Sequence, residues 1–173
     1  MAYNRVTASS TLDRLLTFEE YRFYNDGTDI RYELERGKLI PMPTPSALHI
    51  QICKFLAYWL DRYIIDRDLE FMATSDLGVR TGDDRSRIPD AVVCSRSRWN
   101  NIRDRSGAAV LDLGETPVLV VEVTSQNWRD DYILKRAEYA IAGIPEYWIV
   151  DANQKRVRIL THRECSPHDA ERP

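Results

Sequence analysis

The stretch TPVLVVEVTS, residues 116–125, decides how this chain folds. Its positions 118–121 and 123 are all valine or leucine, and such a short continuous apolar run is typical of a strand buried on both faces of a sheet. Glu122 interrupts the run. Because a buried carboxylate is costly to desolvate unless a cation, a metal ion or a hydrogen-bond donor meets it, Glu122 is predicted to have such a partner.

The residues that follow predict a strand–helix–strand unit. An amphipathic helix is expected over about residues 128–142, with Gly143 as its C-cap residue and Pro145 just beyond it. The segment EYWIVDA, residues 146–152, then supplies another apolar strand. Glu122 would lie near the C-terminal end of the first strand, where functional groups of open α/β sheets gather.

The predicted helix has two faces of different character. Asp131, Lys135 and Tyr139 follow one another at intervals of four residues and therefore share a face. Lys135 could reach from this face over the strand ends toward Glu122. Another stripe is expected to meet the core: Leu134, Ala137 and Ile141.

The composition is that of an ordinary globular protein. The 173 residues are 43% hydrophobic and 29% charged, with a net charge of −3 that does not advertise nucleic-acid binding, although a basic face can hide within it. The sequence has no apolar run near the ~20 residues of a membrane span and no signal-peptide pattern at its N-terminus. Three scattered cysteines without metal-ligand spacing favour a reducing cytoplasm: Cys53, Cys94 and Cys165.

The remaining elements complete an α/β (α+β) domain over residues 17–162, between a loosely ordered N-terminus (1–16) and a flexible tail (163–173). The expected elements are a helix over 18–26 begun by a Thr17–Glu20 capping box, a β-hairpin over 30–45 with its turn at Arg36-Gly37, a long helix over 47–65 capped by Ser46, an extended pair at 69–73 and 77–81, a polar turn, a buried strand at 88–94, a short helix within 95–107, and an edge strand at 156–160. The core face of the long helix is predicted from Ile50, Cys53, Ala57, Leu60 and Ile64.

Two acids stand at the ends of predicted strands. Asp90 follows Pro89 at the start of one apolar strand, and Glu122 nearly closes another. If the strands are neighbours, the two carboxylates would repel each other unless a divalent cation joins them. Hard oxygen ligands with open positions suit Mg²⁺ or Mn²⁺, so both acids are candidate metal ligands.

The ordered set of motifs resembles a known family. The segments YELERGKL, PDAVV, PVLVVEVTS and GIPEYWIVD, with Asp131, Lys135 and Tyr139 between the last two, are similar to the putative restriction endonuclease family (Uma-two type) of the PD-(D/E)XK nuclease superfamily. The similarity covers about residues 17–160. It implies a mixed central sheet flanked by helices, with an N-terminal helix and β-hairpin, and metal-dependent hydrolysis of DNA phosphodiester bonds.

The resemblance also assigns roles to residues. It makes Asp90 and Glu122 the metal ligands and Lys135 the catalytic lysine, and it adds Glu33 and His49 as possible further members of the site. The superfamily pattern places lysine two residues after the acid, where this chain has Thr124. In the Uma-two type the lysine comes from the following helix, which Lys135 matches.

Other interpretations remain open. Arg80, Arg85 and Arg87 belong to an arginine-rich region that could line a DNA-binding surface, but interleaved aspartates also fit an ordinary solvated loop. The domain could be a non-catalytic nucleic-acid-binding or interaction module, or a hydrolase of another phosphoester. For an endonuclease, a two-fold homodimer is expected, with the final edge strand as a candidate contact.

Overall fold

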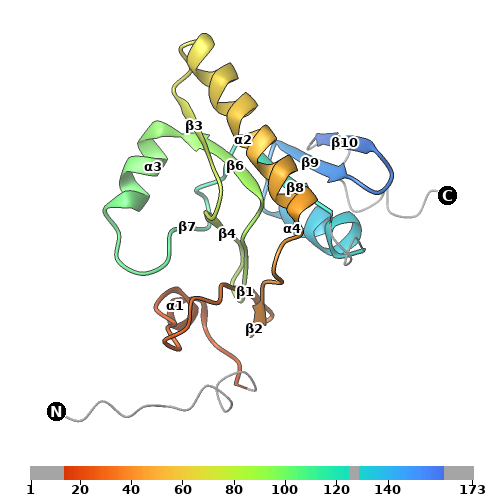
Figure 1. The fold of residues 1–173 in the computed structure, drawn as a ribbon. Helices are drawn as coiled ribbons and strands as arrows, with labels where there is room; N and C mark the ends of the chain where they lie inside the picture. The colour runs from red at the N-terminus through yellow and green to blue at the C-terminus, as the bar shows by residue number, and fades with distance from the viewer. Residues whose placement is uncertain (1–13, 125–128, 162–173) are drawn as a thin grey trace.

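A computed structural model describes residues 14–124 and 129–161, which form two five-stranded mixed sheets and their helices (Figure 1). One sheet has the order β2-β1-β5-β4-β7 and the other β10-β9-β8-β6-β3. The strands are β1 (Tyr32–Glu35), β2 (Lys38–Pro41), β3 (Phe71–Thr74), β4 (Gly78–Gly82), β5 (Arg85–Arg87), β6 (Ala91–Ser95), β7 (Val110–Leu111), β8 (Leu119–Val123), β9 (Glu146–Asp151) and β10 (Arg156–Thr161). The helices are α1 (Phe18–Arg22), α2 (Ala47–Asp66), α3 (Arg96–Arg103), the π-helix η2 (Asp130–Lys135) and α4 (Arg136–Ile141).

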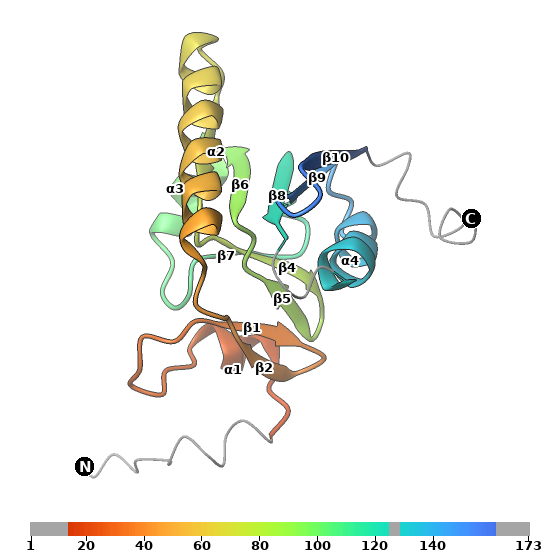
Figure 2. The same cartoon turned by 45° about the vertical axis from the view of Figure 1, so that its right-hand side comes forward.

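Strand β8 is the centre of the second sheet, as the apolar run predicts. All five of its residues are buried, and it pairs antiparallel with β6 and parallel with β9. The chain passes from β8 through η2 and α4 to β9, so the predicted strand–helix–strand unit is confirmed. Figure 2 shows α2 on one side of these strands and α4 on the other. A buried apolar cluster lies on each face, one around Val120 and Tyr139 and one around Val121 and Ile64.

The first sheet differs from the prediction in its pairing. The two extended segments around residues 71 and 80 are not a pair, because β3 joins β6 in one sheet while β4 joins β5 and β7 in the other. Between them Asp76 has a φ of 61°, and the chain turns there from one sheet to the other. The segment predicted as a polar turn instead forms strand β5 and its hairpin with β4.

The N-terminal elements agree with their local signals. Thr17 and Glu20 form the capping box of α1, which ends at Arg22, several residues earlier than predicted. The β1–β2 hairpin turns at Arg36 and Gly37, whose φ values of 51° and 76° are the left-handed pair that a two-residue hairpin turn requires. Leu16, predicted to be loosely ordered, is buried and bonds through its N–H to the carbonyl of Gly37. Residues 1–13 of the predicted N-terminal segment, and the predicted tail from residue 163, lie outside the described residues.

Helix α2 has one face on the sheet and a second apolar face in solvent. Cys53, Leu60 and Ile64 lie toward the sheet, but Ile50, which was predicted to join them, is exposed. Seven large apolar or aromatic side chains of this helix are each more than half exposed: Leu48, Ile50, Phe55, Tyr58, Trp59, Tyr63 and Ile65.

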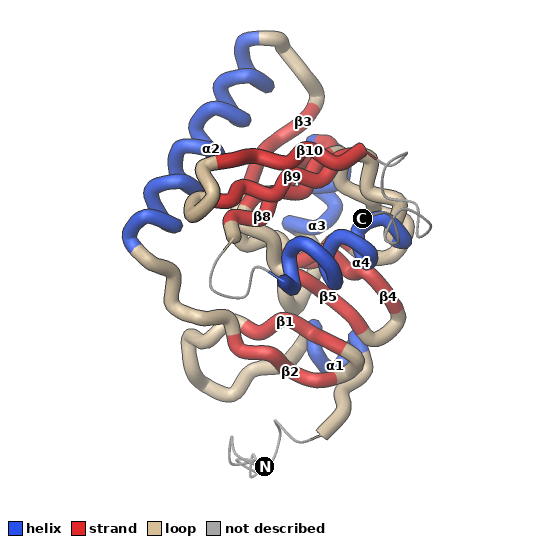
Figure 3. Tube along the Cα trace, turned by 90° about the vertical axis from the view of Figure 1, so that its right-hand side faces the viewer, coloured by secondary structure: helices blue, strands red, loops and turns tan. Residues whose placement is uncertain are grey.

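The helical segment after β8 presents the opposite face to the core from the one predicted. Leu134, Ala137 and Ile141 are exposed, whereas Asp131 and Tyr139 are buried. Figure 3 shows α4 between strands of the two sheets, where Glu138 accepts bonds from Thr81 of β4 and Arg87 of β5. The polar face turns inward because both sheets supply partners for its charged groups.

The C-terminus of α4 fixes this orientation. Its C-cap residue is Ala142, and Gly143, which was predicted to be the C-cap, follows it with a φ of 74°. The N–H groups of Gly143 and Ile144 bond to the carbonyls of Ala140 and Tyr139, which is the paired arrangement of a Schellman motif. Tyr139 is therefore held at the last turn of the helix, with its ring directed into the core.

Candidate active site

Glu122 lies at the centre of a buried polar cluster. Its side chain is almost completely buried, and both carboxylate oxygens are occupied. The hydroxyl of Tyr139 donates to Oε1 at 2.7 Å, and Nζ of Lys135 lies 3.0 Å from Oε2. The acid in the apolar strand therefore has both a cation and a hydrogen-bond donor, the two kinds of partner that its burial requires.

Lys135 reaches this acid from the π-helix, as the sequence predicts. Its ammonium also lies 3.3 Å from Oδ1 of Asp131 and 3.7 Å from Oε1 of Glu33. Only 13% of the lysine side chain is exposed, so it does not lie on a solvated helix face. Single π-helical turns are uncommon and often occur at functional sites. One cation thus joins carboxylates from two strands and a helix.

Asp90 lies at the edge of the same sheet, one residue before β6 and after the buried Pro89. The β6–β8 pairing ends with Ala91 opposite Val121, and Asp90 lies just before that pair. Oδ2 of Asp90 accepts the backbone N–H of Val123 at 2.7 Å. Oδ1 is 2.8 Å from Nε2 of His49 on α2. Asp90 therefore links the end of β8 to the helix on the other side of the sheet.

Glu33 brings the first sheet into the site. It is buried on β1, where Oε1 accepts the N–H of Ile88 at 3.0 Å and Oε2 accepts a bond from Arg87 at 3.1 Å. Arg87 in turn makes a two-pronged contact with Glu138, at 2.8 and 2.7 Å. This network fixes β1 and β5 against α4 and holds the Glu33 carboxylate near Lys135.

The buried part of the cluster around Lys135 contains more acidic groups than basic ones. Burial raises the pKa of Glu122 to about 8; the Lys135 ammonium opposes that rise, and the charges of the neighbouring acids Asp131, Asp90 and Glu33 add to it. Burial likewise raises the pKa of Asp131 to about 6. A second cation beside such carboxylates would favour their ionised form. The oxygen donors therefore fit a hard divalent ion of the Mg²⁺ class.

His49, on α2, contacts the carboxylate of Asp90. Its hydrogen bond to Asp90 raises the pKa of the imidazole to about 10, so the ring carries a positive charge at neutral pH. The cap of α2 places it there, because Oγ of Ser46 accepts the N–H of His49 at 3.2 Å. Both residues that the resemblance added to the site, Glu33 and His49, thus contact its charged groups.

Sequence reasoning did not assign Asp131 or Glu138 to the site. Asp131 was recognised only as a possible surface partner of Lys135, and the structure buries both. The spacing of four residues was the available signal, but it does not distinguish a buried pair from an exposed one. Thr124, which stands where the superfamily pattern has lysine, is buried beside β9 and donates its N–H to Val150. The lysine charge comes from the helix instead.

The arginines predicted to bind DNA are largely occupied by internal partners. Arg87 is buried against Glu33 and Glu138. Arg80 bonds to Asp112 at 2.8 Å and lies over the ring of Phe18. Arg85 is more accessible, and its guanidinium lies 3.9 Å from Glu138. The interior position of Arg87 argues against a direct phosphate contact by that residue.

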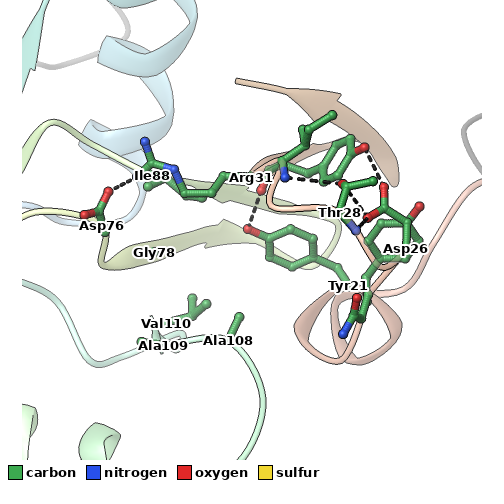
Figure 4. Close-up of a pocket in the computed structure, with 14 residues that line it drawn as sticks. Tyr21, Asp26, Thr28, Arg31, Asp76, Gly78, Ile88, Ala108, Ala109 and Val110 are labelled. Atoms are coloured by element: carbon green, nitrogen blue, oxygen red, sulfur yellow. Dashed lines mark hydrogen bonds and ion pairs between the residues drawn. The ribbon is translucent and has the colours of Figure 1, made fainter. Parts of the chain in front are cut away.

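A pocket of about 340 Å³ lies elsewhere, between α1, the loop before β1 and the start of β4 (Figure 4). Its lining includes Tyr21, whose hydroxyl donates to the carbonyl of Tyr32, and the ion pair of Arg31 with Asp76. It does not contain the acids around Lys135. Among the described residues, no helix is long and apolar enough to cross a membrane.

Comparisons with known proteins agree with this geometry. Residues 18–171 match the model of the Uma2 family, described as "Putative restriction endonuclease". No curated protein matches the chain. A solved structure described as a putative nuclease belonging to DUF820, from Anabaena variabilis ATCC 29413, is similar with a TM-score of 0.60 and 21% sequence identity over 79% of this chain and 74% of that one. At this identity the structural likeness supports the fold, while the family model covers most of the sequence. The chain belongs to the Uma2 family of putative restriction endonucleases.

Proposed function

We propose that this protein is a metal-dependent endonuclease that hydrolyses DNA phosphodiester bonds. The observation that carries the proposal is the contact of Lys135 with Glu122 at 3.0 Å, at the end of β8, where the side chain of Asp90 accepts the N–H of Val123. Two acids and a lysine brought together from separate elements match the set that the family resemblance assigns to catalysis. A purely structural ion pair would not need the additional buried acids.

In this proposal Asp90 and Glu122 hold Mg²⁺ or Mn²⁺, and Lys135 acts on the substrate. A bound divalent cation supplies charge neutralisation at the phosphate and a water of lowered pKa. Lys135 orients the attacking water or stabilises the charged phosphate through its ammonium, which Glu33 and Asp131 keep in position. Tyr139 orients the Glu122 carboxylate by donating to its other oxygen.

DNA is the proposed substrate, and its binding surface lies on the side where the site meets solvent. His49 and Asp90 are each nearly one-fifth exposed at their side chains, so the outer edge of the cluster is accessible. Arg85 is the member of the predicted arginine set that remains about one-third exposed, and its ion pair with Glu138 is long, at 3.9 Å. It is therefore the best candidate for a phosphate contact, and Arg80 and Arg87 are proposed to support the site from inside.

Cleavage of both DNA strands favours a two-fold homodimer, and we place its contact at the exposed apolar face of α2. The edge strand β10 is less suitable, because its exposed Arg156 and Arg158 would meet their own copies across a two-fold axis. Helix α2 carries both signs of charge beside its apolar side chains, so a second copy can be matched electrostatically. The dimer is proposed to work in the reducing cytoplasm, where the free Cys53 and Cys94 would stay reduced. Light scattering should give twice the chain mass for the wild type and the single-chain mass for Trp59→Glu.

The catalytic proposal is tested by plasmid nicking together with thermal melts. Mg²⁺ or Mn²⁺ should raise the melting temperature of the wild type, because an ion that binds only the folded state stabilises it by about 2.7 kcal/mol at a hundredfold excess over its Kd. Asp90→Ala and Glu122→Ala should lose both the shift and the nicking. Absence of any metal shift in the wild type would favour the non-catalytic module. Metal-dependent hydrolysis of a model phosphodiester without DNA nicking would favour another phosphoester.

A further inference from the structure

A second set of metal-ligating atoms lies on the outer side of Asp90. Nε2 or Nδ1 of His49, Sγ of Cys53 and a carboxylate oxygen of Asp90 all lie within 4.8 Å of one another. His49 and Cys53 are four residues apart on α2 and so project from the same face of the helix. Cys53 is a free thiol, and all three residues are partly accessible to solvent.

The chemistry of this set differs from that of the acid cluster. Glu122 and its neighbours offer oxygen atoms, which suit Mg²⁺, whereas an imidazole and a thiolate select a softer transition metal ion. Three protein ligands with a fourth position open to water are the usual arrangement of non-structural zinc sites. We propose that His49, Cys53 and Asp90 form a binding site for a thiophilic divalent ion of the Zn²⁺ class, distinct from the Mg²⁺ site but sharing Asp90 with it.

The His49–Asp90 distance requires only a small adjustment, and Cys53 has to approach both residues from within 4.8 Å. In a tetrahedral site with metal–ligand bonds of about 2.0–2.3 Å, neighbouring ligand atoms lie about 3.3–3.6 Å apart. The His49 and Asp90 atoms are 2.8 Å apart in this structure, joined by a hydrogen bond. An entering ion replaces that bond; the imidazolium and the thiol each release one proton to water and bind as neutral imidazole and thiolate, and the His49 and Asp90 atoms separate by about half an ångström. The Ser46 cap holds the start of α2, and the Val123 N–H holds Asp90 at the end of β8. These anchors can keep Cys53, the third ligand, in place.

Sharing Asp90 makes the two sites antagonistic. Oδ1 of Asp90 faces His49, and Oδ2 is held by the N–H of Val123, so the carboxylate is oriented by groups on both sides. A soft ion bound through His49 and Cys53 withdraws Asp90 from the Mg²⁺ site. Zn²⁺ is therefore expected to inhibit Mg²⁺-dependent cleavage, but the binding itself does not depend on the protein's being a nuclease.

Cobalt provides the direct test, because a thiolate bound to Co²⁺ gives a near-ultraviolet charge-transfer band. The full chain should show this band, saturating at one Co²⁺ per chain and displaced by Zn²⁺. Cys53→Ser should lose the band, and His49→Asn should weaken Co²⁺ binding at least tenfold. The matched control is a double variant, Cys94→Ala with Cys165→Ala, which removes the other two thiols and should keep the band; residue 165 lies outside the described residues.

Two variants separate this inference from the proposed function. Glu122→Gln should lose the Mg²⁺-induced shift in melting temperature and retain the cobalt–thiolate band. Cys53→Ser should retain the Mg²⁺-induced shift in melting temperature and lose the cobalt–thiolate band. A wild type without a stoichiometric band, or a band that persists in folded Cys53→Ser, would overturn the proposed site. If Cys53→Ser does not fold, unchanged Co²⁺ affinity in His49→Asn would have the same consequence. Failure of the Mg²⁺ shift alone would count only against the nuclease site.

Discussion

The helical segment η2–α4 and helix α2 bury their side chains by opposite rules. The first buries its acidic and basic face and exposes Leu134 and Ile141, while α2 packs apolar residues on the sheet and leaves a second apolar face in solvent. The difference is in the partners that each helix meets. Glu33, Glu122 and Arg87 surround the polar face of η2–α4, so its charges are paired on burial. Hydrophobicity alone does not determine which face of a helix is inside.

The arrangement also separates two kinds of energetic role. A buried ion pair replaced by apolar residues is often no less stable, so the polar interior of η2–α4 is weak evidence for a stability function. We propose that it serves chemistry that needs a lysine and several carboxylates together. The exposed apolar face of α2 suits association instead, because large exposed apolar patches mark interaction surfaces.

The largest effect is expected from Lys135→Ala. Removing one partner of a buried ion pair destabilises a protein by about 3–5 kcal/mol, because the remaining charges stay buried without compensation. Urea unfolding in the presence of a chelator measures this loss. The matched control is Lys38→Ala on the exposed side of β2, which should change the free energy of unfolding by no more than about 0.5 kcal/mol. Equal losses in the free energy of unfolding of the two variants would mean that the ion pairs of Lys135 do not stabilise the fold.

Tyr139→Phe should have an intermediate effect. The substitution keeps the ring in the core and removes only the hydroxyl that donates to Oε1 of Glu122. A buried acceptor left without its donor costs about 1–3 kcal/mol. The same measurement on Tyr58→Phe, whose side chain is largely exposed, should give no detectable change. A neutral Tyr139→Phe would show that Glu122 relies on Lys135 alone.

The smallest effect is expected at an ion pair on the surface. Arg105 lies against Glu115, and both side chains are about one-quarter to one-third exposed. Glu115→Gln should therefore cost less than about 1 kcal/mol at neutral pH. The Arg105 guanidinium lowers the pKa of Glu115 below its ordinary value of 4.5, so this stabilisation is present above that pH and is lost as the pH falls through the lowered value. Melts of the two proteins should converge in acid; a difference that persists there would contradict the assignment to this charge.

The sequence predicted the parts of the fold that rest on local signals. The apolar run around Glu122, the Arg36-Gly37 turn, the capping box and the glycine after α4 each determine their geometry through nearby residues, and each is confirmed. It also placed Asp90, Glu122 and Lys135 in one site by family resemblance. The Lys135–Glu122 contact and the bond from the Val123 N–H to Asp90 place the three residues at the end of β8, and their joint role in catalysis stays a prediction.

The features that the sequence did not predict depend on residues far apart in the chain. Leu134 and Ile141 look like a core stripe, and only the positions of Glu33 and Glu122 explain why the opposite face is buried. The division into two sheets likewise depends on which strand β3 and β4 each find, because short extended segments have no local preference for a partner. Cys53 was predicted only as part of the core face of the long helix, because Asp90, which bonds to the neighbouring His49, is 41 residues from His49 along the chain.

The measurement that tests the central claim most directly compares metal binding and cleavage in Lys135→Ala. This variant removes the ammonium group but retains both proposed metal ligands. If the inward polar face serves catalysis, the variant should show a Mg²⁺-induced rise in melting temperature while nicking plasmid DNA far more slowly than the wild type and Lys38→Ala. A general acid, base or charge-stabilising group of this kind typically contributes a factor of about 10²–10⁴ in rate. Nicking at the wild-type rate by folded Lys135→Ala would contradict the account and leave Lys135 as a structural partner of its acids.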